Sequence, residues 1–332
     1  MSSRTERWHD GKWPFPLLLP LGWLFRAISA VRRLAYARGW LSAWRAPVPV
    51  IVIGNITVGG TGKTPLALAL VERLRAAGWR PGIVSRGYGG QADYPARVDA
   101  ASPASVVGDE PLLLARRSGV PVVVDPLRAR GVRHLLAGSD CNLVVCDDGL
   151  QHYALARDIE IAVIDGQRGL GSGLPLPAGP LREPPSRLAS VDFCVINGDW
   201  LARSPRPEAG VTMTLAAAPW LPVTAAGEGA QPPAPGPVHA VAGIGHPPRF
   251  FALLERLGYQ PLPHAFPDHH AYSAGDLEFT PPLPLVMTEK DAVKCAGLAP
   301  ANTWFVPVQA MLPESFWQAL LTRLATWRSP HA

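Results

Sequence analysis

Short runs of apolar, mostly β-branched residues recur along the first two thirds of the chain, separated by segments with helical spacing. The first run covers residues 48–53, and a helix is expected to follow at residues 65–74. Unbroken apolar runs of this length are typical of parallel strands covered on both faces. Further strands are expected at residues 82–85, 122–125, 143–148, 159–165 and 193–197. This alternation predicts an α/β fold with a doubly wound parallel sheet, whose ligands bind beyond the carboxyl ends of the strands.

The pattern changes at residues 223–237, which are rich in proline, glycine and alanine and predict a linker. Strands at 238–244 and 284–287, with a helix at 248–257, then predict a second, smaller α/β domain over residues 238–332, closed by an amphipathic helix at 314–327. A length of 332 residues with 48% hydrophobic residues is ample for two cores. We therefore expect an N-terminal segment at 1–45, a main domain at 46–222, the linker, and the smaller domain.

The N-terminal segment, residues 13–40, is apolar and cationic, and no acidic residue lies between Lys12 and Val71. Its uninterrupted apolar stretch, residues 14–25, is too short to span a bilayer as a helix, and no small-x-small cleavage site follows it. Apolar residues then recur at helical spacing, at Leu24, Phe25, Ile28, Val31 and Leu34. This pattern predicts either an amphipathic helix lying in a membrane interface or a helix packed on the core of its own domain.

A glycine-rich turn, TVGGTGKT, follows the first strand. Its glycines let several backbone N–H groups converge on one phosphate group, as in a P-loop NTPase. We expect Lys63 to reach the β- and γ-phosphates of ATP and Thr64 to place its hydroxyl on Mg²⁺. The predicted ATP site consists of Thr57, Val58, Gly59, Gly60, Thr61, Gly62, Lys63 and Thr64.

The match to a P-loop is partial, because the usual pattern has glycine where this chain has Thr57. A turn that binds nothing is the alternative. The chain holds only four lysines, however, and otherwise uses arginine. A lysine retained at position 63 favours the phosphate-binding interpretation, since a compact ammonium is a role that arginine does not fill.

Two adjacent carboxylates, Asp147 and Asp148, end the expected strand 143–148. An apolar strand that delivers a carboxylate beside a P-loop is the usual way to hold Mg²⁺. Two neighbouring carboxylates also repel each other unless a cation lies between them. The sequence thus predicts a metal site formed by Thr64, Asp147 and Asp148, with a helix N-cap or a turn as the alternative.

Composition narrows the class of partner. The net charge is only +5 and no basic run reaches five residues, so a nucleic-acid partner is not favoured. The four cysteines show no CxxC or paired spacing, which indicates buried, reduced thiols of a cytosolic protein.

Seven motifs, GNITVGGTGKTP, VSRGYGG, VGDEP, DDGLQH, LPAGPLREP, FPDHHAY and TEKDAVK, occur in this order. Together they resemble the tetraacyldisaccharide 4′-kinase family of lipid A biosynthesis, from about residue 47 to residue 294. The family's own P-loop begins TVGGTGKT, which accounts for Thr57. The resemblance implies Mg²⁺-dependent transfer of the ATP γ-phosphate to the 4′-hydroxyl of tetraacyldisaccharide 1-phosphate, giving lipid IVA. It also implies a peripheral or monotopic location on the cytoplasmic face of the inner membrane.

The resemblance carries roles over to individual residues. Asp109 of VGDEP corresponds to the base, and a histidine of FPDHH, His269 or His270, orients it once the two domains close. We assign this orienting role to His269. Lys63 and the arginines Arg86, Arg128 and Arg182 are expected to neutralise phosphate charge. The proline-rich loop at residues 176–184 is expected to hold Arg182 and Glu183 in place as catalytic residues.

Two other functions remain open from the sequence. A membrane-associated P-loop ATPase switch of the partitioning or metal-insertion type would hydrolyse ATP to drive partner binding, but it has no need of FPDHHAY and TEKDAVK facing the phosphates. A soluble ligase-type synthetase would not need the N-terminal helix. The kinase is therefore the favoured function.

Overall fold

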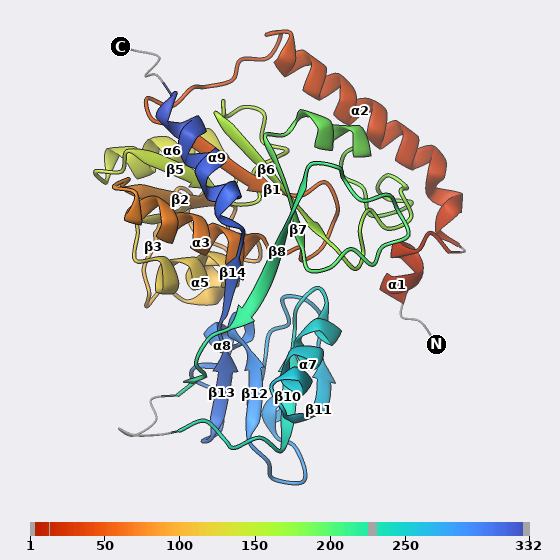
Figure 1. Ribbon diagram of the computed structural model, residues 1–332, viewed down its shortest axis with the longest axis vertical. Coiled ribbons are helices and arrows are strands. Elements are labelled where there is room, and N and C mark those ends of the chain that lie inside the picture. The colour runs from red at the N-terminus through yellow and green to blue at the C-terminus, as the bar shows by residue number, and fades with distance from the viewer. Residues whose placement is uncertain (1–3, 13, 225–230, 328–332) are drawn as a thin grey trace.

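A computed structural model describes residues 4–12, 14–224 and 231–327 of the chain (Figure 1). Its larger unit is built on a nine-stranded sheet with the order β14-β8-β7-β6-β1-β5-β2-β4-β3. All neighbours are parallel except β3 and β14, which run antiparallel to β4 and β8. The strands are β1 (Val50–Gly54), β2 (Pro81–Ser85), β3 (Ala96–Val98), β4 (Val122–Val124), β5 (Leu143–Cys146), β6 (Ile159–Asp165), β7 (Phe193–Asn197), β8 (Gly210–Ala217) and β14 (Val308–Met311). The predicted doubly wound sheet is confirmed.

Helices cover both faces of this sheet, and β1 shows why its sequence is apolar throughout. Ile51 and Ile53 pack in one core with α3 (Lys63–Ala76) and α5 (Asp109–Ser118), whereas Val50 and Val52 pack in a second core with α6 (Arg128–Ala137). Successive side chains of a strand point to opposite faces, so a central strand must be apolar at every position. A short helix, α4 (Ala104–Val107), precedes α5.

The smaller unit holds a five-stranded sheet with the order β11-β10-β12-β13-β9. Its strands are β9 (Leu221–Pro222), β10 (Pro237–Ala242), β11 (Gln260–Ala265), β12 (Leu285–Thr288) and β13 (Thr303–Val306). Two helices, α7 (Pro247–Arg256) and α8 (Glu289–Cys295), and a 3₁₀ turn, η3 (Ala274–Leu277), complete it. Residues 225–230 of the expected linker lie outside the described residues.

The expected C-terminal boundary of the smaller domain is wrong. After β13 the chain returns to the larger unit, where β14 pairs with β8 and α9 (Glu314–Ala325) packs in the same core as α3. The apolar face of α9, with Phe316, Trp317 and Leu320 buried, is satisfied by the larger core rather than the smaller one. Strands β8 and β14 therefore run side by side as the connection between the two units (Figure 1).

The N-terminal residues form α1 (Arg4–His9), a 3₁₀ turn, η1 (Phe15–Leu18), and the long helix α2 (Leu19–Ala37), which lies along the edge of the larger unit (Figure 1). Pro20 lies in the first turn of α2, where it needs no hydrogen-bonded N–H, so it begins the helix instead of interrupting it. Gly22 is buried against Pro175, and Arg33 lies 4.0 Å from the Glu183 carboxylate. Trp13 lies outside the described residues.

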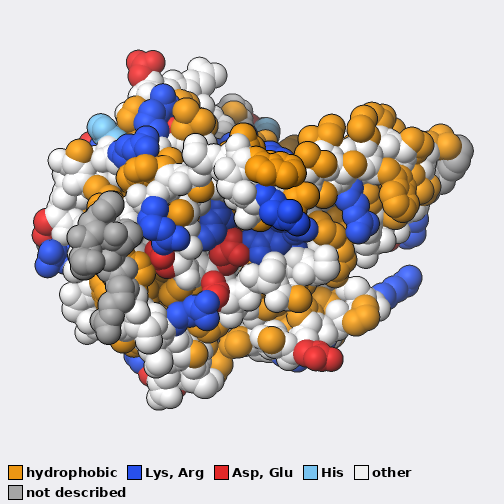
Figure 2. All heavy atoms as spheres, turned by 90° about the horizontal axis from the view of Figure 1, so that it is seen from above, with side chains coloured by type: hydrophobic (Ala, Val, Ile, Leu, Met, Phe, Trp, Pro, Cys, Tyr) orange, Lys and Arg blue, Asp and Glu red, His pale blue; other side chains and the backbone are white. Residues whose placement is uncertain are grey.

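The face of α2 opposite Gly22 is apolar and exposed to solvent. Leu21, Leu24, Ile28 and Val31 are 55%, 57%, 60% and 63% exposed, so this stripe does not pack on the protein's own core. Among the described residues, 15–37 form one segment that is long and apolar enough, by length and composition, to cross a membrane. Hydrophobic side chains cover the projecting helix in Figure 2. An exposed apolar face of this kind suggests membrane association.

Candidate active site

The turn after β1 has the geometry of a phosphate-binding loop. Gly59 and Gly62 adopt φ values of 108° and 94°, a region that favours glycine, and α3 begins at Lys63, two residues earlier than expected. Two asparagines at strand ends hold the loop: Asn55 Nδ2 donates to the Gly59 carbonyl at 3.2 Å, and Asn197 Nδ2 donates to the Thr61 carbonyl at 3.0 Å. Neither asparagine was predicted as a site residue, although Asn55 lies two residues beyond the predicted strand at 48–53 and Asn197 ends the predicted strand at 193–197.

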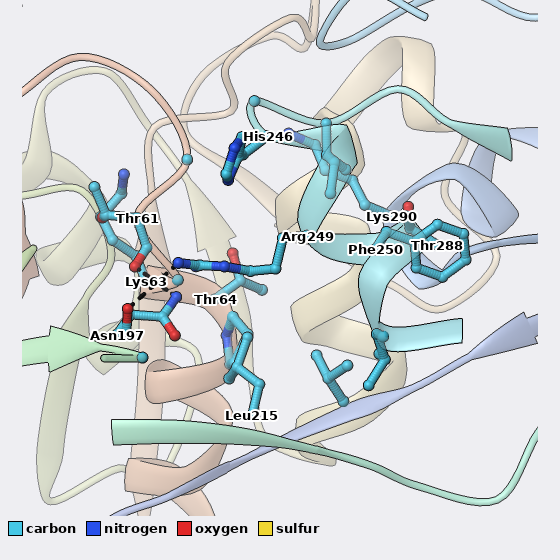
Figure 3. A pocket seen from close by; sticks show the side chains of 18 of the residues that line it. Thr61, Lys63, Thr64, Asn197, Leu215, His246, Arg249, Phe250, Thr288 and Lys290 are labelled. Atoms are coloured by element: carbon cyan, nitrogen blue, oxygen red, sulfur yellow. Dashed lines mark hydrogen bonds between the residues drawn. The ribbon is translucent and has the colours of Figure 1, made fainter. Parts of the chain in front are cut away.

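A cavity of about 380 Å³ lies between the two units and is lined by this loop, by α7 and by the start of α8 (Figure 3). Arg249 reaches from α7 toward the loop, and its Nη2 lies 3.1 Å from Asp165 Oδ1 and 3.4 Å from the Asn197 carbonyl oxygen. Arg168 donates to the Gly245 carbonyl across the same boundary. Arg249 was also missed from sequence, since nothing in α7 marks it as an arginine that faces the other unit.

The predicted metal-binding carboxylates directly follow β5 (Leu143–Cys146), beside this loop. Asp148 adopts a φ of 47°, and its carboxylate lies 3.6 Å from Lys63 Nζ and 3.2 Å from Arg182 Nη1. Burial opposes ionisation, but these two cations outweigh it and hold the pKa of Asp148 well below its usual range. Asp147 is 1% exposed, and burial raises its pKa to about 7. The pKa of Asp148 is thus lowered, whereas the pKa of its neighbour Asp147 is raised.

The donor set at this point suits Mg²⁺. Asp147 Oδ1 is buried and has no hydrogen-bond partner among the described residues, whereas Oδ2 accepts from the Ser85 hydroxyl at 3.4 Å. No group of three or more His, Cys, Asp or Glu side chains in the described part of the chain could hold a metal by itself. Mg²⁺ prefers one or two carboxylates completed by waters and substrate phosphates, and the Thr64 hydroxyl next to Lys63 is a further donor.

Arg128, which was expected to neutralise phosphate charge, is buried. It is 2% exposed, its Nη1 donates to the Asp125 carbonyl at 2.7 Å, and its Nη2 donates to the carbonyls of Asp147 and Asp148 at 3.2 and 3.4 Å. Its side chain reaches from the first residue of α6 to the backbone that follows β5. Its guanidinium therefore supports the backbone of the carboxylate pair and does not face the cavity between the units.

The proline-rich loop is fixed against the phosphate-binding loop, as expected: Arg182 N donates to the Ile56 carbonyl at 2.8 Å, and Val58 N donates to the Pro180 carbonyl at 2.9 Å. Glu183, by contrast, turns inward. Its carboxylate accepts from Gln151 Nε2 and the Tyr153 hydroxyl, both at 2.7 Å, and lies 3.3 Å from Arg187 Nε.

Because both carboxylate oxygens of Glu183 already have hydrogen-bond or ion-pair partners, this side chain holds the surrounding loops together and is not positioned to act as a base.

The two units meet at a carboxylate–imidazole pair. Asp109, at the start of α5, is 5% exposed, and each of its carboxylate oxygens lies 3.0 Å from His269 Nδ1, 160 residues away. Burial raises the pKa of Asp109, but the hydrogen bond from His269 and the charge of Lys290 outweigh it, so the pKa is lowered. The hydrogen bond to Asp109 raises the pKa of His269. His270 instead lies 3.5 Å from Asp276.

His269 adopts a φ of 61°, in the left-handed region that non-glycine residues seldom occupy. Such strain is found at functional sites because surrounding contacts maintain it. Of the two candidate histidines, the structure therefore brings His269, and not His270, to Asp109.

A second cavity, of about 530 Å³, lies between α2 and the loops that follow β5. It shares Asp148 and Arg182 with the phosphate-binding region, and Figure 2 shows basic side chains gathered in a hollow beside the projecting helix. Its other arginines are Arg26, Arg32, Arg33 and Arg86. His152 also lines it, and burial together with the charges of Arg128 and Arg86 lowers the pKa of His152 to about 3. The cavity is thus cationic and opens toward the exposed apolar helix.

Residues 15–325 match the family model described as tetraacyldisaccharide-1-P 4′-kinase. The chain belongs to this family. Among its relatives, the tetraacyldisaccharide 4′-kinase of Alkalilimnicola ehrlichii is 55% identical over 90% of this chain and 89% of its own length. The enzymes of Pseudomonas paraeruginosa and Stenotrophomonas maltophilia are 51% and 50% identical, each over more than 90% of both chains. This chain is accordingly a kinase of lipid A biosynthesis, and the ATPase-switch alternative is not favoured.

The fold of this kinase agrees with a solved member of the family. A crystal structure of LpxK from Aquifex aeolicus, described as an apo form in complex with ATP, superimposes with a TM-score of 0.75 at 27% identity, covering 93% of this chain and 99% of the other.

Proposed function

We propose that this kinase transfers the γ-phosphate of ATP to the 4′-hydroxyl of tetraacyldisaccharide 1-phosphate, with Asp109 as the base that accepts the hydroxyl proton. The observation that carries this assignment is the contact between Asp109 and His269 next to the phosphate-binding cavity. A sugar hydroxyl has a pKa far above neutrality, so an ionised and oriented carboxylate is the base that such a reaction requires. His269 orients Asp109 through Nδ1.

The phosphate groups of ATP are held by the turn at residues 57–64, whose N–H groups and helix N-terminus favour an anion. Mg²⁺, held by Thr64, Asp147 and Asp148, would neutralise charge on the phosphates. Lys63 and Arg182 lie on either side of the Asp148 carboxylate. We assign these two cations to the transferred phosphoryl group, because phosphoryl transfer depends on positioning and charge neutralisation.

The lipid enters from the side of α2. The second cavity is cationic, it reaches Asp148 at its inner end, and it lies beside the exposed apolar stripe of α2. An apolar face in the acyl region with arginines at headgroup level fits a helix in the membrane interface. Because ATP is the phosphate donor, we place the enzyme on the cytoplasmic face of the inner membrane.

The test is to incubate the protein with γ-labelled ATP and the lipid disaccharide in mixed micelles and to separate labelled lipid from inorganic phosphate. The wild type is expected to label the lipid, and Asp109→Asn to lose about 10²–10⁴-fold of that rate while still binding ATP. Asp276→Asn, which changes a carboxylate that contacts His270 and Ser273 but not the Asp109–His269 pair, is the matched control and should stay near wild type. Label that appeared only as inorganic phosphate would favour an ATPase switch and refute the proposal.

A further inference from the structure

Lys290, the second residue of α8, joins both units at the Asp109–His269 pair. Its side chain is only 14% exposed. Its Nζ lies 2.9 Å from Glu110 Oε1 on α5, 3.0 Å from Asp268 Oδ1 and 3.4 Å from His269 Nε2, and it is 3.8 Å from Asp109 Oδ2. The three N–H bonds of the ammonium therefore have one partner each, two carboxylates and one imidazole nitrogen.

This geometry indicates which nitrogen of the imidazole carries the proton. An ammonium can only donate, so Nε2 of His269 must accept and carries no proton. The single proton of the neutral ring then lies on Nδ1, which donates to the two Asp109 oxygens at 3.0 Å. Which nitrogen of a histidine is protonated is commonly set by the partner of the other nitrogen.

We propose that Lys290 is a positioning residue for phosphoryl transfer: its ammonium holds His269 as the neutral Nδ1–H tautomer and so keeps Asp109 oriented and ionised. The catalytic part of this inference rests on the proposed role of Asp109 as the base. The tautomer itself does not, because it follows from the hydrogen bonds of the ring alone.

The carboxylates around the ring favour its protonation, which the charge of Lys290 opposes. Asp268 Oδ1 lies 3.8 Å from His269 Nε2, and Asp109 faces Nδ1, so the imidazole stands between two carboxylates. Tyr88 packs on the ring at a centroid distance of 4.8 Å and contributes no charge. The hydrogen bond to Asp109 outweighs burial and the Lys290 charge, so the pKa of His269 is raised overall, but less than it would be without Lys290. Glu110 faces Lys290, and the charge of Lys294 acts on Asp109 more weakly than that of Lys290.

Removing the ammonium should therefore raise the pKa of His269. In Lys290→Met, His269 loses a neighbouring positive charge and Asp268 can accept from Nε2, so the imidazolium is favoured and its pKa rises. A protonated His269 pairs so strongly with Asp109 that the carboxylate is a poorer base. The acid limb of the pH profile of kcat should then move to higher pH, with a loss at neutral pH of about 10- to 100-fold, as expected for one charged hydrogen bond.

The experiment has two readouts. ¹⁵N spectra of histidine-labelled full-length protein report the tautomer and pKa of His269, assigned with His269→Gln, and the kcat profile reports the acid limb. The wild type should show the Nδ1–H tautomer. Lys290→Met should show a raised His269 pKa and an acid limb shifted to higher pH, and Lys290→Arg should return most of both changes toward wild type. Lys290→Gln, which keeps a donor without the charge, should fall between.

Arg117→Met is the matched control. Arg117 Nη1 pairs with Glu289 at 2.6 and 2.7 Å, so it also joins α5 to α8 but does not contact the pair. Its loss should leave the acid limb in place. A wild-type Nε2–H tautomer, or an equal shift of the limb in Arg117→Met, would overturn the inference and reduce Lys290 to a tether between the units. Full activity of Asp109→Asn would instead refute the base assignment, while the ¹⁵N spectra still decide the role of Lys290.

Discussion

The contact between Asp109 and His269 predicts that the two residues act as one unit in catalysis. Hydrogen bonds to charged groups contribute about 1.5–3 kcal/mol, so His269→Ala should lower kcat by roughly 10- to 150-fold. Asp109→Ala removes the base itself and should cost about 10²–10⁴-fold. Once Asp109 is absent, His269 has nothing to orient. The double variant should therefore be no slower than Asp109→Ala alone, with a coupling free energy close to the whole effect of His269→Ala.

The assay is transfer of labelled γ-phosphate to the lipid at saturating ATP, measured for both single variants and the double. His270→Ala is the matched control, because His270 is next in sequence but lies 3.5 Å from Asp276 and does not contact Asp109. It should retain most of the activity. Losses that multiply in the double variant, or a larger loss from His270→Ala than from His269→Ala, would refute the pairing.

Three further predictions concern other parts of the molecule. Lys63→Arg should lower lipid phosphorylation on the order of 10²-fold, since a planar guanidinium cannot replace a compact ammonium between the loop and Asp148; near-normal turnover would remove the main argument for the phosphate-binding loop. Ile28, on α2, is 60% exposed, and Ile28→Asp should reduce co-sedimentation with anionic vesicles without changing the melting temperature. Unchanged co-sedimentation would mean that α2 serves only to pack on the protein. Glu183→Ala leaves the nearly buried Arg187 without one of its carboxylates and should lower the free energy of unfolding in urea by about 3 kcal/mol; a change under 1 kcal/mol would contradict the structural role.

The sequence by itself determined the local features of this protein. The strand before the phosphate-binding turn is apolar at every position because both faces are buried, and two glycines of the turn, Gly59 and Gly62, are the points where φ is positive. The carboxylates at the end of β5 were likewise predictable, because in a parallel sheet the carboxyl ends of the strands lie at the ligand side. In each of these cases a few consecutive residues carry all the necessary information.

Tertiary structure decided which way side chains turn and what they meet. The apolar pattern of α9 predicted one buried face but not that this face covers the larger core. Arg128 and Glu183 lie in segments correctly expected near the site, yet both side chains turn inward to backbone carbonyls or to polar partners. The pairing of Asp109 with His269 joins residues that are 160 positions apart, and the contact of Lys290 with Glu110 joins residues that are 180 positions apart. Such contacts depend on how the two units pack together, and no local pattern of residues encodes that packing.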